Sequence, residues 1–259
     1  MKEYRNHQGT ILLAGVMIAA AVVHSAALGN HLVSDSWVFV QPRSFTDTLR
    51  FFWTSIIPED GEAFWLRPLP MFLFWLENVV RPGTEWLPHL TNILLHTLNV
   101  FLLWHVVRIM GTRSDGRNDR EGEISAFAAC VVYGLHPLTV GSVDWVAARF
   151  DVACVTFGLG GMYYWFRWDA PGKGFGSFAA ACALLVSSLL SKEQGITFFA
   201  CCAFFTLVGA IGRRKLGSNE ILGIGVPIAA AAPYFLYRLP LFRGDCGYVT
   251  AIHGLRVGP

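Results

Sequence analysis

The chain has 259 residues, of which 54% are hydrophobic and only 15% are charged, and its formal net charge is +2. Soluble domains usually contain about 25% charged residues, so a soluble fold is excluded and the long apolar runs indicate burial in a lipid bilayer. The small net charge, without a basic cluster beyond the RRK sequence at 213–215, argues against a nucleic-acid partner.

The apolar runs predict an all-α membrane bundle of about seven spans, because one crossing needs about 20 apolar residues. The runs fall at 10–28, 89–110, 124–137, 143–166, 177–190, 194–211 and 221–238. Two are short, which favours tilt or a partner helix that continues the crossing. A cleaved signal peptide is the alternative for the first run, but six further runs argue for one transmembrane domain over 1–259.

The Lys and Arg residues predict the orientation of the bundle. With a cytoplasmic N-terminus, the basic loops at 111–123, 167–176 and 212–220 all fall inside, as the positive-inside rule expects. The long segment 29–88 and the tail 239–259 then lie outside the cytoplasm.

The first outer segment, 29–88, is expected to contain one or two interfacial helices. Ser44 followed by Asp47 resembles a capping box, and the apolar residues after it fall on one face of an amphipathic helix at 44–56. The next apolar stretch, at 69–80, is too short to span comfortably. A true span there would also invert every later loop and move the basic loops outside.

Polar residues interrupt the apolar runs mainly at their predicted outer ends. In the PHLTNILLHTLN sequence, His89, Asn92, His96 and Asn99 follow the three–four–three spacing of one helical stripe. The outer ends of other runs carry Asp35, Arg67, His136, Asp144, Arg149, Lys192 and Glu193. Ionisable groups at membrane depth are costly and indicate function, although for any single residue interhelical pairing is the competing explanation.

These residues occur in an order that resembles a known enzyme family. The motifs are Asp35 after the first run, RPL at 67–69, HLTNILLHTLN at 89–99, GLHPLTVGSVDWVAARFDV at 134–152, SKE at 191–193 and YRLPLFRGDCGY at 237–248. Together they resemble bacterial membrane glycosyltransferases of the C-type (GT-C) superfamily, close to the transmembrane and tetratricopeptide-repeat O-mannosyltransferases. The resemblance implies an integral protein of the bacterial inner membrane.

The chain departs from that family pattern at four points. The family has an acidic pair in the first outer loop, where this chain has Asp35 followed by Ser36. Gly141 stands where the family tends to have Glu, and Ala148 where it often has Gly. Relatives also continue through further spans, so the chain is expected to be shorter than they are, and a non-catalytic scaffold of the same fold is one alternative function.

The resemblance implies transfer of a sugar from a polyprenyl-phosphate donor to a hydroxyl of a protein, glycan or lipid. It makes Asp35 the candidate general base. Arg67, Arg149 and Lys192 would stabilise the leaving phosphate, with Glu193 holding Lys192 and Asp144 or Asp151 orienting Arg149. His89 would touch the donor or acceptor, and Asn92, His136 and Asp144 would complete the binding site.

No cofactor or metal is expected. The sequence contains no CxxC pair, no zinc-like Cys/His spacing and no clear His–carboxylate ligand spacing. The other alternative function is a small-molecule transporter, which predicts polar residues at all depths and internal repeats; no repeat is visible.

Overall fold

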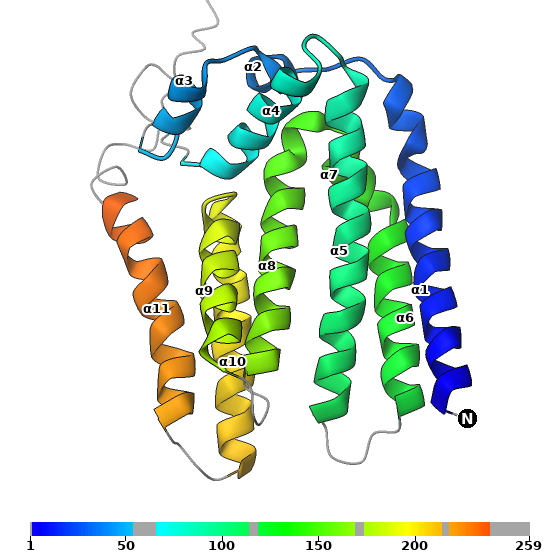
Figure 1. Cartoon of the computed structure of the whole chain (residues 1–259), viewed down its shortest axis with the longest axis vertical. Helices are drawn as coiled ribbons and strands as arrows, with labels where there is room; N and C mark the ends of the chain where they lie inside the picture. The colour runs from blue at the N-terminus through cyan, green and yellow to red at the C-terminus, as the bar shows by residue number, and fades with distance from the viewer. Residues whose placement is uncertain (1, 54–65, 114–118, 169–173, 214–217, 239–259) are drawn as a thin grey trace, which may run out of the picture.

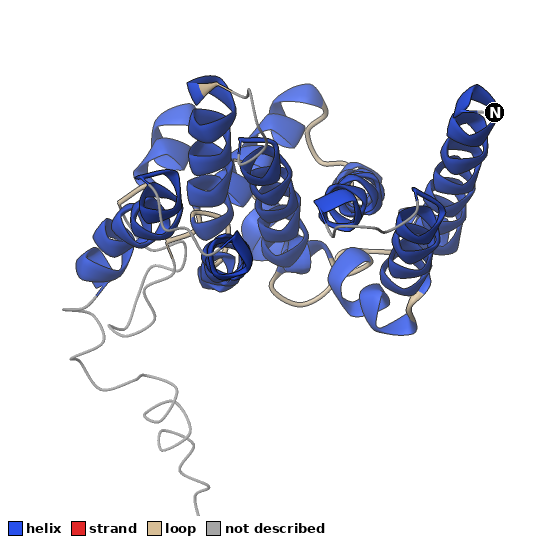
Figure 2. Ribbon diagram, turned by 90° about the horizontal axis from the view of Figure 1, so that it is seen from below, coloured by secondary structure: helices blue, strands red, loops and turns tan. Residues whose placement is uncertain are grey.

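The computed structural model describes residues 2–53, 66–113, 119–168, 174–213 and 218–238, and within these ranges it is helical and contains no β-strand. The long helices run side by side in alternating directions (Figure 1). They are α1 (Lys2–His24), α5 (Trp86–Arg113), α6 (Asp119–Leu135), α8 (Arg149–Trp168), α9 (Phe175–Leu189), α10 (Ile196–Arg213) and α11 (Ser218–Arg238). A long helix therefore lies at each expected run, with α1 and α11 on opposite sides of the bundle (Figures 1 and 2).

The short elements gather at one end of the bundle, which we call the capped end. Across it lie α2 (Ser36–Val40), α3 (Phe45–Arg50) and α4 (Pro68–Val80) (Figure 1). The remaining short elements are η1 (Ser25–Gly29), η2 (Pro137–Thr139), α7 (Val140–Val143), η3 (Val146–Ala148) and η4 (Glu193–Gly195). The first residues of α1 lie at the opposite end, as do the last residues of α5, α8 and α10 and the first residues of α6, α9 and α11.

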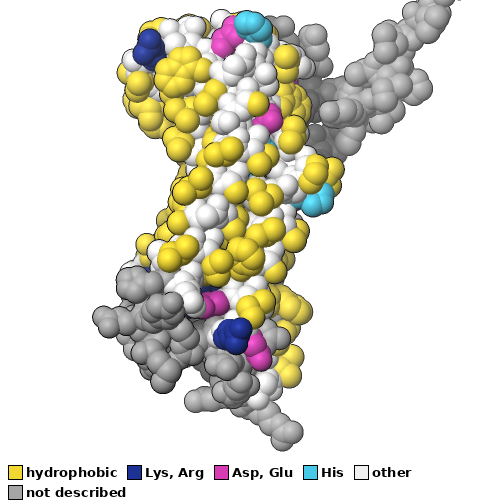
Figure 3. Space-filling view, turned by 90° about the vertical axis from the view of Figure 1, so that its right-hand side faces the viewer, with side chains coloured by type: hydrophobic (Ala, Val, Ile, Leu, Met, Phe, Trp, Pro, Cys, Tyr) yellow, Lys and Arg dark blue, Asp and Glu magenta, His cyan; other side chains and the backbone are white. Residues whose placement is uncertain are grey.

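Not every long helix has the length and composition of a membrane span. Gln8–Gly29, Trp86–Gly111 and Glu193–Gly212 qualify, and a fourth span is obtained if Arg120–Leu135 and Pro137–Val143, bent by 49°, count as one. The described residues thus contain three or four candidate spans rather than about seven. Pro68–Val80 and Phe175–Leu189 are apolar but shorter. On the face seen in Figure 3, hydrophobic side chains dominate the middle, and the visible Lys and Arg side chains lie near its two ends.

Local sequence signals explain where several elements begin and end. Ser44 caps α3, because its Oγ accepts a hydrogen bond from the Asp47 N–H at 3.1 Å, which confirms the predicted cap. The helix ends at Arg50, earlier than expected. α4 begins with Pro68 in its first turn, where the missing N–H costs nothing. α6 ends before the His136–Pro137 pair, since a residue that precedes proline is pushed out of the helical region.

Small residues let the helices on one side of the bundle approach closely. A Cβ added at Gly158 would lie 2.2 Å from the Phe198 ring, and one at Gly161 would lie 2.7 Å from Leu185. α8 therefore packs tightly against α9 and α10, as small residues allow in membrane helices. The expected placement of 239–259, and of 54–65 within the first outer segment, concerns parts of the chain outside the described residues.

Candidate functional site

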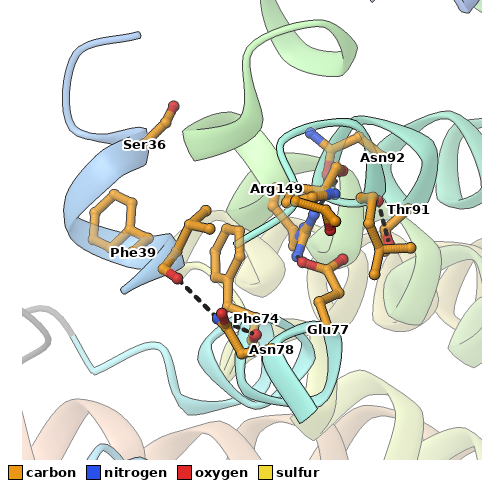
Figure 4. Close-up of polar contacts among 12 residues, drawn as sticks. Ser36, Phe39, Phe74, Glu77, Asn78, Thr91, Asn92 and Arg149 are labelled. Atoms are coloured by element: carbon orange, nitrogen blue, oxygen red, sulfur yellow. Dashed lines mark hydrogen bonds and ion pairs between the residues drawn. The ribbon is translucent and has the colours of Figure 1, made fainter. Parts of the chain in front are cut away.

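A completely buried arginine joins three helices beneath the capped end. Arg149, the first residue of α8, donates from Nη1 to Glu77 Oε2 at 2.8 Å, from Nε to Asn92 Oδ1 at 2.9 Å and from Nη2 to the Pro88 carbonyl at 2.7 Å. Its guanidinium lies 3.9 Å from the centre of the Phe74 ring. Figure 4 shows Arg149 pointing toward Glu77 of α4 and Asn92 of α5. We call Glu77, Asn92 and Arg149 the buried hub.

The carboxylate on Arg149 corrects one expectation from the sequence. Asp144 and Asp151 were the candidates, yet the ion pair is formed by Glu77. Because each nitrogen of the guanidinium already donates to the protein, Arg149 is held rigidly between α4, α5 and α8. An ion pair this deeply buried is costly to break, since either partner alone would be an uncompensated charge.

Asn92 is also saturated. Its Nδ2 donates to the carbonyls of Val143 at 3.1 Å and Trp145 at 3.3 Å, while its Oδ1 accepts from Arg149. Asn92 therefore ties α5 to the irregular backbone between α7 and α8.

His89 lies one turn earlier on α5 and has different surroundings. It is buried and close to the Asp144 backbone. Neither of its ring nitrogens has a hydrogen-bond partner of ordinary geometry among the described residues. Apart from its approach to the Asp144 backbone, His89 thus has unused hydrogen-bonding capacity.

Asp144 pairs with a histidine that the sequence analysis did not single out. Nδ1 of His24, at the end of α1, lies 2.6 Å from Oδ1 of Asp144. The other ring nitrogen lies 3.4 Å from the Thr139 hydroxyl. The pair joins α1 to the bend after α6, and His24 is buried whereas Asp144 is partly exposed.

Deeper in the stripe, His96 and Asn99 bond to neighbouring helices. His96 Nε2 lies 3.2 Å from the Gly134 carbonyl, and Asn99 Nδ2 donates to the Val152 carbonyl at 3.1 Å. His136 is exposed, and its Nδ1 accepts from the Leu138 N–H at 3.2 Å, which caps η2.

Two further ion pairs lie at the capped end near the turn between α9 and α10. Lys192 Nζ lies 2.5 Å from Asp151 Oδ1, and Arg67 Nη2 donates to Glu193 Oε2 at 2.9 Å. Glu193 thus pairs with Arg67, and the expectation that it holds Lys192 is wrong. The Lys192 side chain keeps 20% of its surface exposed, so this cation stays accessible while its carboxylate partner orients it.

Gly195 fixes the shape of that turn. A Cβ at this position would come within 2.6 Å of the backbone of Ser188 and Leu189, so only glycine permits the turn to fold back on the end of α9. The close approach sets where Lys192 and Glu193 leave the bundle.

Asp35 occupies the N-cap position of α2, but its side chain makes no capping hydrogen bond. Its Oδ1 is buried and has no hydrogen-bond partner among the described residues, and Ser34 before it has a φ of +55°. Such strained backbone is found mainly where the surrounding structure imposes it, often at functional sites. Ser36, which stands where the resembling family has its second acid, is buried and accepts from the Ala147 N–H at 3.2 Å.

An apolar cluster links Asp35 to the arginine of the RPL motif. Phe39, one turn after Asp35, lies 5.0 Å from Phe150 between ring centres, and the Arg67 guanidinium lies over the Phe150 ring, 5.3 Å from its centre. Because these rings are part of one buried cluster, the positions of α2, Arg67 and α8 are coupled. Residues from motifs far apart in the chain are thus brought to one end of the bundle.

Glu77 and His24 are the residues that sequence analysis missed. Each is a polar residue within an apolar helix, Glu77 in α4 and His24 in α1. Such a residue requires a partner, and that signal was available in the sequence. No group of three or more His, Cys, Asp or Glu side chains that could hold a metal ion occurs in the described ranges.

The comparisons with known proteins follow the resemblance seen in the motifs. Protein O-mannosyl-transferase Tmtc1 of Drosophila melanogaster is 26% identical over 237 residues, covering 86% of this chain and 26% of the relative. Protein O-mannosyl-transferase TMTC1 of Homo sapiens is 27% identical over 229 residues, covering 82% of this chain and 25% of the relative. This chain therefore spans about a quarter of the length of these curated relatives.

Other comparisons limit how far this similarity extends. Protein O-mannosyl-transferase tmtc2 of Xenopus laevis is 24% identical over 179 residues, covering 67% of this chain and 20% of the relative. No family model and no solved structure matches the chain. The relatives named here are animal proteins, so they do not support the expected bacterial inner membrane.

The candidate spans and these relatives agree on an integral membrane protein. The resemblance suggested by the motifs and the names of these relatives point to the same group of proteins. The chain is similar, at 24–27% identity, to protein O-mannosyl-transferases of the TMTC group.

Proposed function

We propose that the chain is the membrane part of a glycosyltransferase that moves a sugar from a polyprenyl-phosphate donor to a hydroxyl, foremost of a protein, at the capped end. The observation that carries this proposal is the meeting of the motif residues at that end, around a carboxylate whose buried oxygen has no partner among the described residues. The names of the relatives support the transfer of mannose to protein.

Asp35 is the general base in this proposal. It takes the proton from the acceptor hydroxyl as that oxygen forms a bond to the anomeric carbon of the sugar. The bond from that carbon to the phosphate oxygen breaks, and the lipid phosphate leaves with the electron pair. An unpartnered carboxylate oxygen suits this role, because no internal donor has to be displaced before a hydroxyl can approach.

Lys192 and Arg67 stabilise the departing phosphate. Asp151 and Glu193 orient these cations in the absence of donor, and an incoming phosphate adds acceptor oxygens that both cations can reach by small side-chain movements. Because Lys192 is the more exposed of the two, we assign it the first contact with the donor.

The remaining candidates divide by their free hydrogen-bonding capacity. His89 keeps hydrogen-bonding capacity beyond its approach to the Asp144 backbone and is assigned to the donor or acceptor. Arg149 and Asn92 are saturated within the buried hub, and the geometry favours a positioning role for them. Asp144 and His136 contribute through the backbone break that they stabilise beside the site.

We also propose that the bundle crosses the membrane about seven times, with the N-terminus cytoplasmic and the capped end extracytoplasmic. The short helices would cross by tilting or by thinning the bilayer locally, and the basic connections would lie inside. Single-cysteine labelling from outside the membrane tests this arrangement: Asp60→Cys should react and Asn118→Cys should not. Reaction of both, or of neither, contradicts the proposed topology.

The function is tested by a transfer assay in membranes, with a radiolabelled polyprenyl-phosphate sugar and a Ser/Thr-containing protein acceptor. Parent membranes should transfer sugar, and Asp35→Asn should lower the rate by about 100-fold or more, the usual scale for a general base. Ser36→Ala is the matched control, because Ser36 is next to Asp35 in the chain and its hydroxyl accepts a hydrogen bond from the protein backbone. Transfer by Asp35→Asn at the parental rate would exclude Asp35 as the base.

A further inference from the structure

A pocket at the capped end lies outside the ion pairs assigned to the donor. It has a volume of about 160 Å³ and lies between α2 and the turn that joins α4 to α5. Its lining includes Leu32, Trp37 and Gln41 in or near α2, and Asn78, Thr84 and Glu85 in α4 and the α4–α5 turn. The indole of Trp37 is exposed, with 47% of the residue surface accessible.

The size of the pocket limits what it can hold. Pockets for whole small-molecule ligands are typically about 300–1,000 Å³, well above the 160 Å³ found here. Water takes about 30 Å³ per molecule in the liquid, so the space corresponds to roughly five waters. That volume suits one side chain of a longer molecule and is too small for a complete lipid-linked sugar.

The charge of the lining opposes the donor phosphate. None of the described lining residues is Lys or Arg, whereas Glu85 provides a carboxylate that is held 2.9 Å from His31 Nδ1. A phosphate would meet negative charge here, although cations are available near Lys192. An indole beside amide, hydroxyl and carboxylate groups instead suits a polypeptide, which offers both an apolar side chain and N–H donors.

The position of the pocket relates it to Asp35. Trp37 and Gln41 follow Asp35 by two and six residues along the chain. At 3.6 residues per helical turn, Trp37 lies on the face of the short helix α2 away from Asp35. An extended peptide advances about 3.3 Å per residue, so a peptide with one side chain in the pocket reaches Asp35 within a few residues.

We propose that this pocket anchors one apolar side chain of the acceptor polypeptide, a few residues from the hydroxyl that receives the sugar. The inference rests on the proposed function for its acceptor class but concerns a separate surface. The acceptor binds at α2 and the α4–α5 turn, and the donor phosphate binds near the α9–α10 turn.

A binding experiment tests the pocket without requiring turnover. In the full chain, Thr84→Cys is alkylated with a membrane-impermeant maleimide, and the product is quantified at that residue by mass spectrometry. The probe is a synthetic peptide with a central Thr and a Phe two residues away. The peptide should slow alkylation about fivefold, as expected for a largely occupied site. Leu138→Cys, which is exposed and outside the pocket, is the control.

The outcomes separate the possible occupants. Protection by the peptide, lost when its Phe is moved to the end, supports the anchor. No protection by peptide overturns the proposal, and protection by polyprenyl phosphate in its place assigns the pocket to the donor and also overturns it. Because alkylation needs no catalysis, a parent that binds peptide but transfers no sugar counts against the proposed function alone.

A kinetic measurement gives the second readout. Trp37→Ala should raise the KM for the peptide about tenfold, equivalent to about 1.4 kcal/mol, and leave the KM for the donor unchanged. Trp53→Ala is the matched control, since Trp53 is exposed at the same end and does not line the pocket. An unchanged peptide KM in Trp37→Ala, with transfer intact, counts against the pocket alone.

Discussion

The buried hub and the Lys192–Asp151 pair are both ion pairs between a cation and a carboxylate, but they differ in exposure to solvent. Arg149 and Glu77 are sealed beneath the capped end, and each guanidinium nitrogen donates to a protein acceptor. Lys192 and Asp151 remain partly exposed. A saturated, buried cation has nothing left to offer a ligand, whereas an accessible cation held by one carboxylate can add a phosphate. The difference indicates that burial and saturation, more than residue type, separate structural from binding residues.

The largest expected effect is on the buried hub. Arg149→Ala leaves the Glu77 carboxylate buried without its cation, which should lower the free energy of unfolding by about 3–5 kcal/mol. Urea unfolding in detergent, or the folded yield on size-exclusion chromatography, measures this loss.

The matched control removes both charges. Arg149→Met combined with Glu77→Leu leaves no unpaired charge, so it should retain more stability than Arg149→Ala alone. A double variant that is as unstable as the sum of the two single variants would show that the ion pair contributes nothing to the cost.

The next effect concerns the accessible pair. Lys192→Ala should weaken donor binding about tenfold, or about 1.4 kcal/mol, while the folded yield stays near the parental value. Lys192→Arg should keep part of the affinity, because a guanidinium also binds phosphate. Binding of a polyprenyl-phosphate analogue is measured by isothermal titration, and parental affinity in Lys192→Ala would remove this residue from the donor site.

The smallest expected effect is at an uncharged contact, the Ser44 cap of α3, which gives a reference for the two ion pairs. Ser44→Ala removes the cap of α3 and should destabilise that helix locally by about 1 kcal/mol. Hydrogen exchange of the amides at 45–50 should accelerate about fivefold, and Ser44→Thr should restore most of the protection. Unchanged exchange in Ser44→Ala would mean that packing of α3 on α4, rather than the cap, holds the helix.

The sequence predicted features that depend on neighbouring residues. Helix positions follow from apolar runs, the α3 cap from Ser44 and Asp47, and the break after α6 from Pro137. The expected number of spans exceeded the three or four candidates found, because short or charge-bearing helices such as α9 and α8 do not meet the requirements of length and composition.

The sequence did not predict which residues form ion pairs with one another. The partners of Arg149 and Asp144 proved to be Glu77 and His24, which are distant in the chain and on other helices. Predicting them requires knowledge of which helices are neighbours, and apolar periodicity does not contain that information. The pairing of Glu193 with an arginine was predictable as a type of contact, but its identity as Arg67 was not.

The central claim is that catalysis belongs to the accessible part of the capped end, and the buried hub only supports it. The most direct measurement is the transfer rate per folded molecule for the parent, Asp35→Asn, and Arg149→Met combined with Glu77→Leu. The account predicts at least a 100-fold loss for Asp35→Asn with parental stability, and a loss of less than about tenfold for the folded fraction of the hub variant. Parental transfer by Asp35→Asn, or a folded hub variant as inactive as Asp35→Asn, would contradict it.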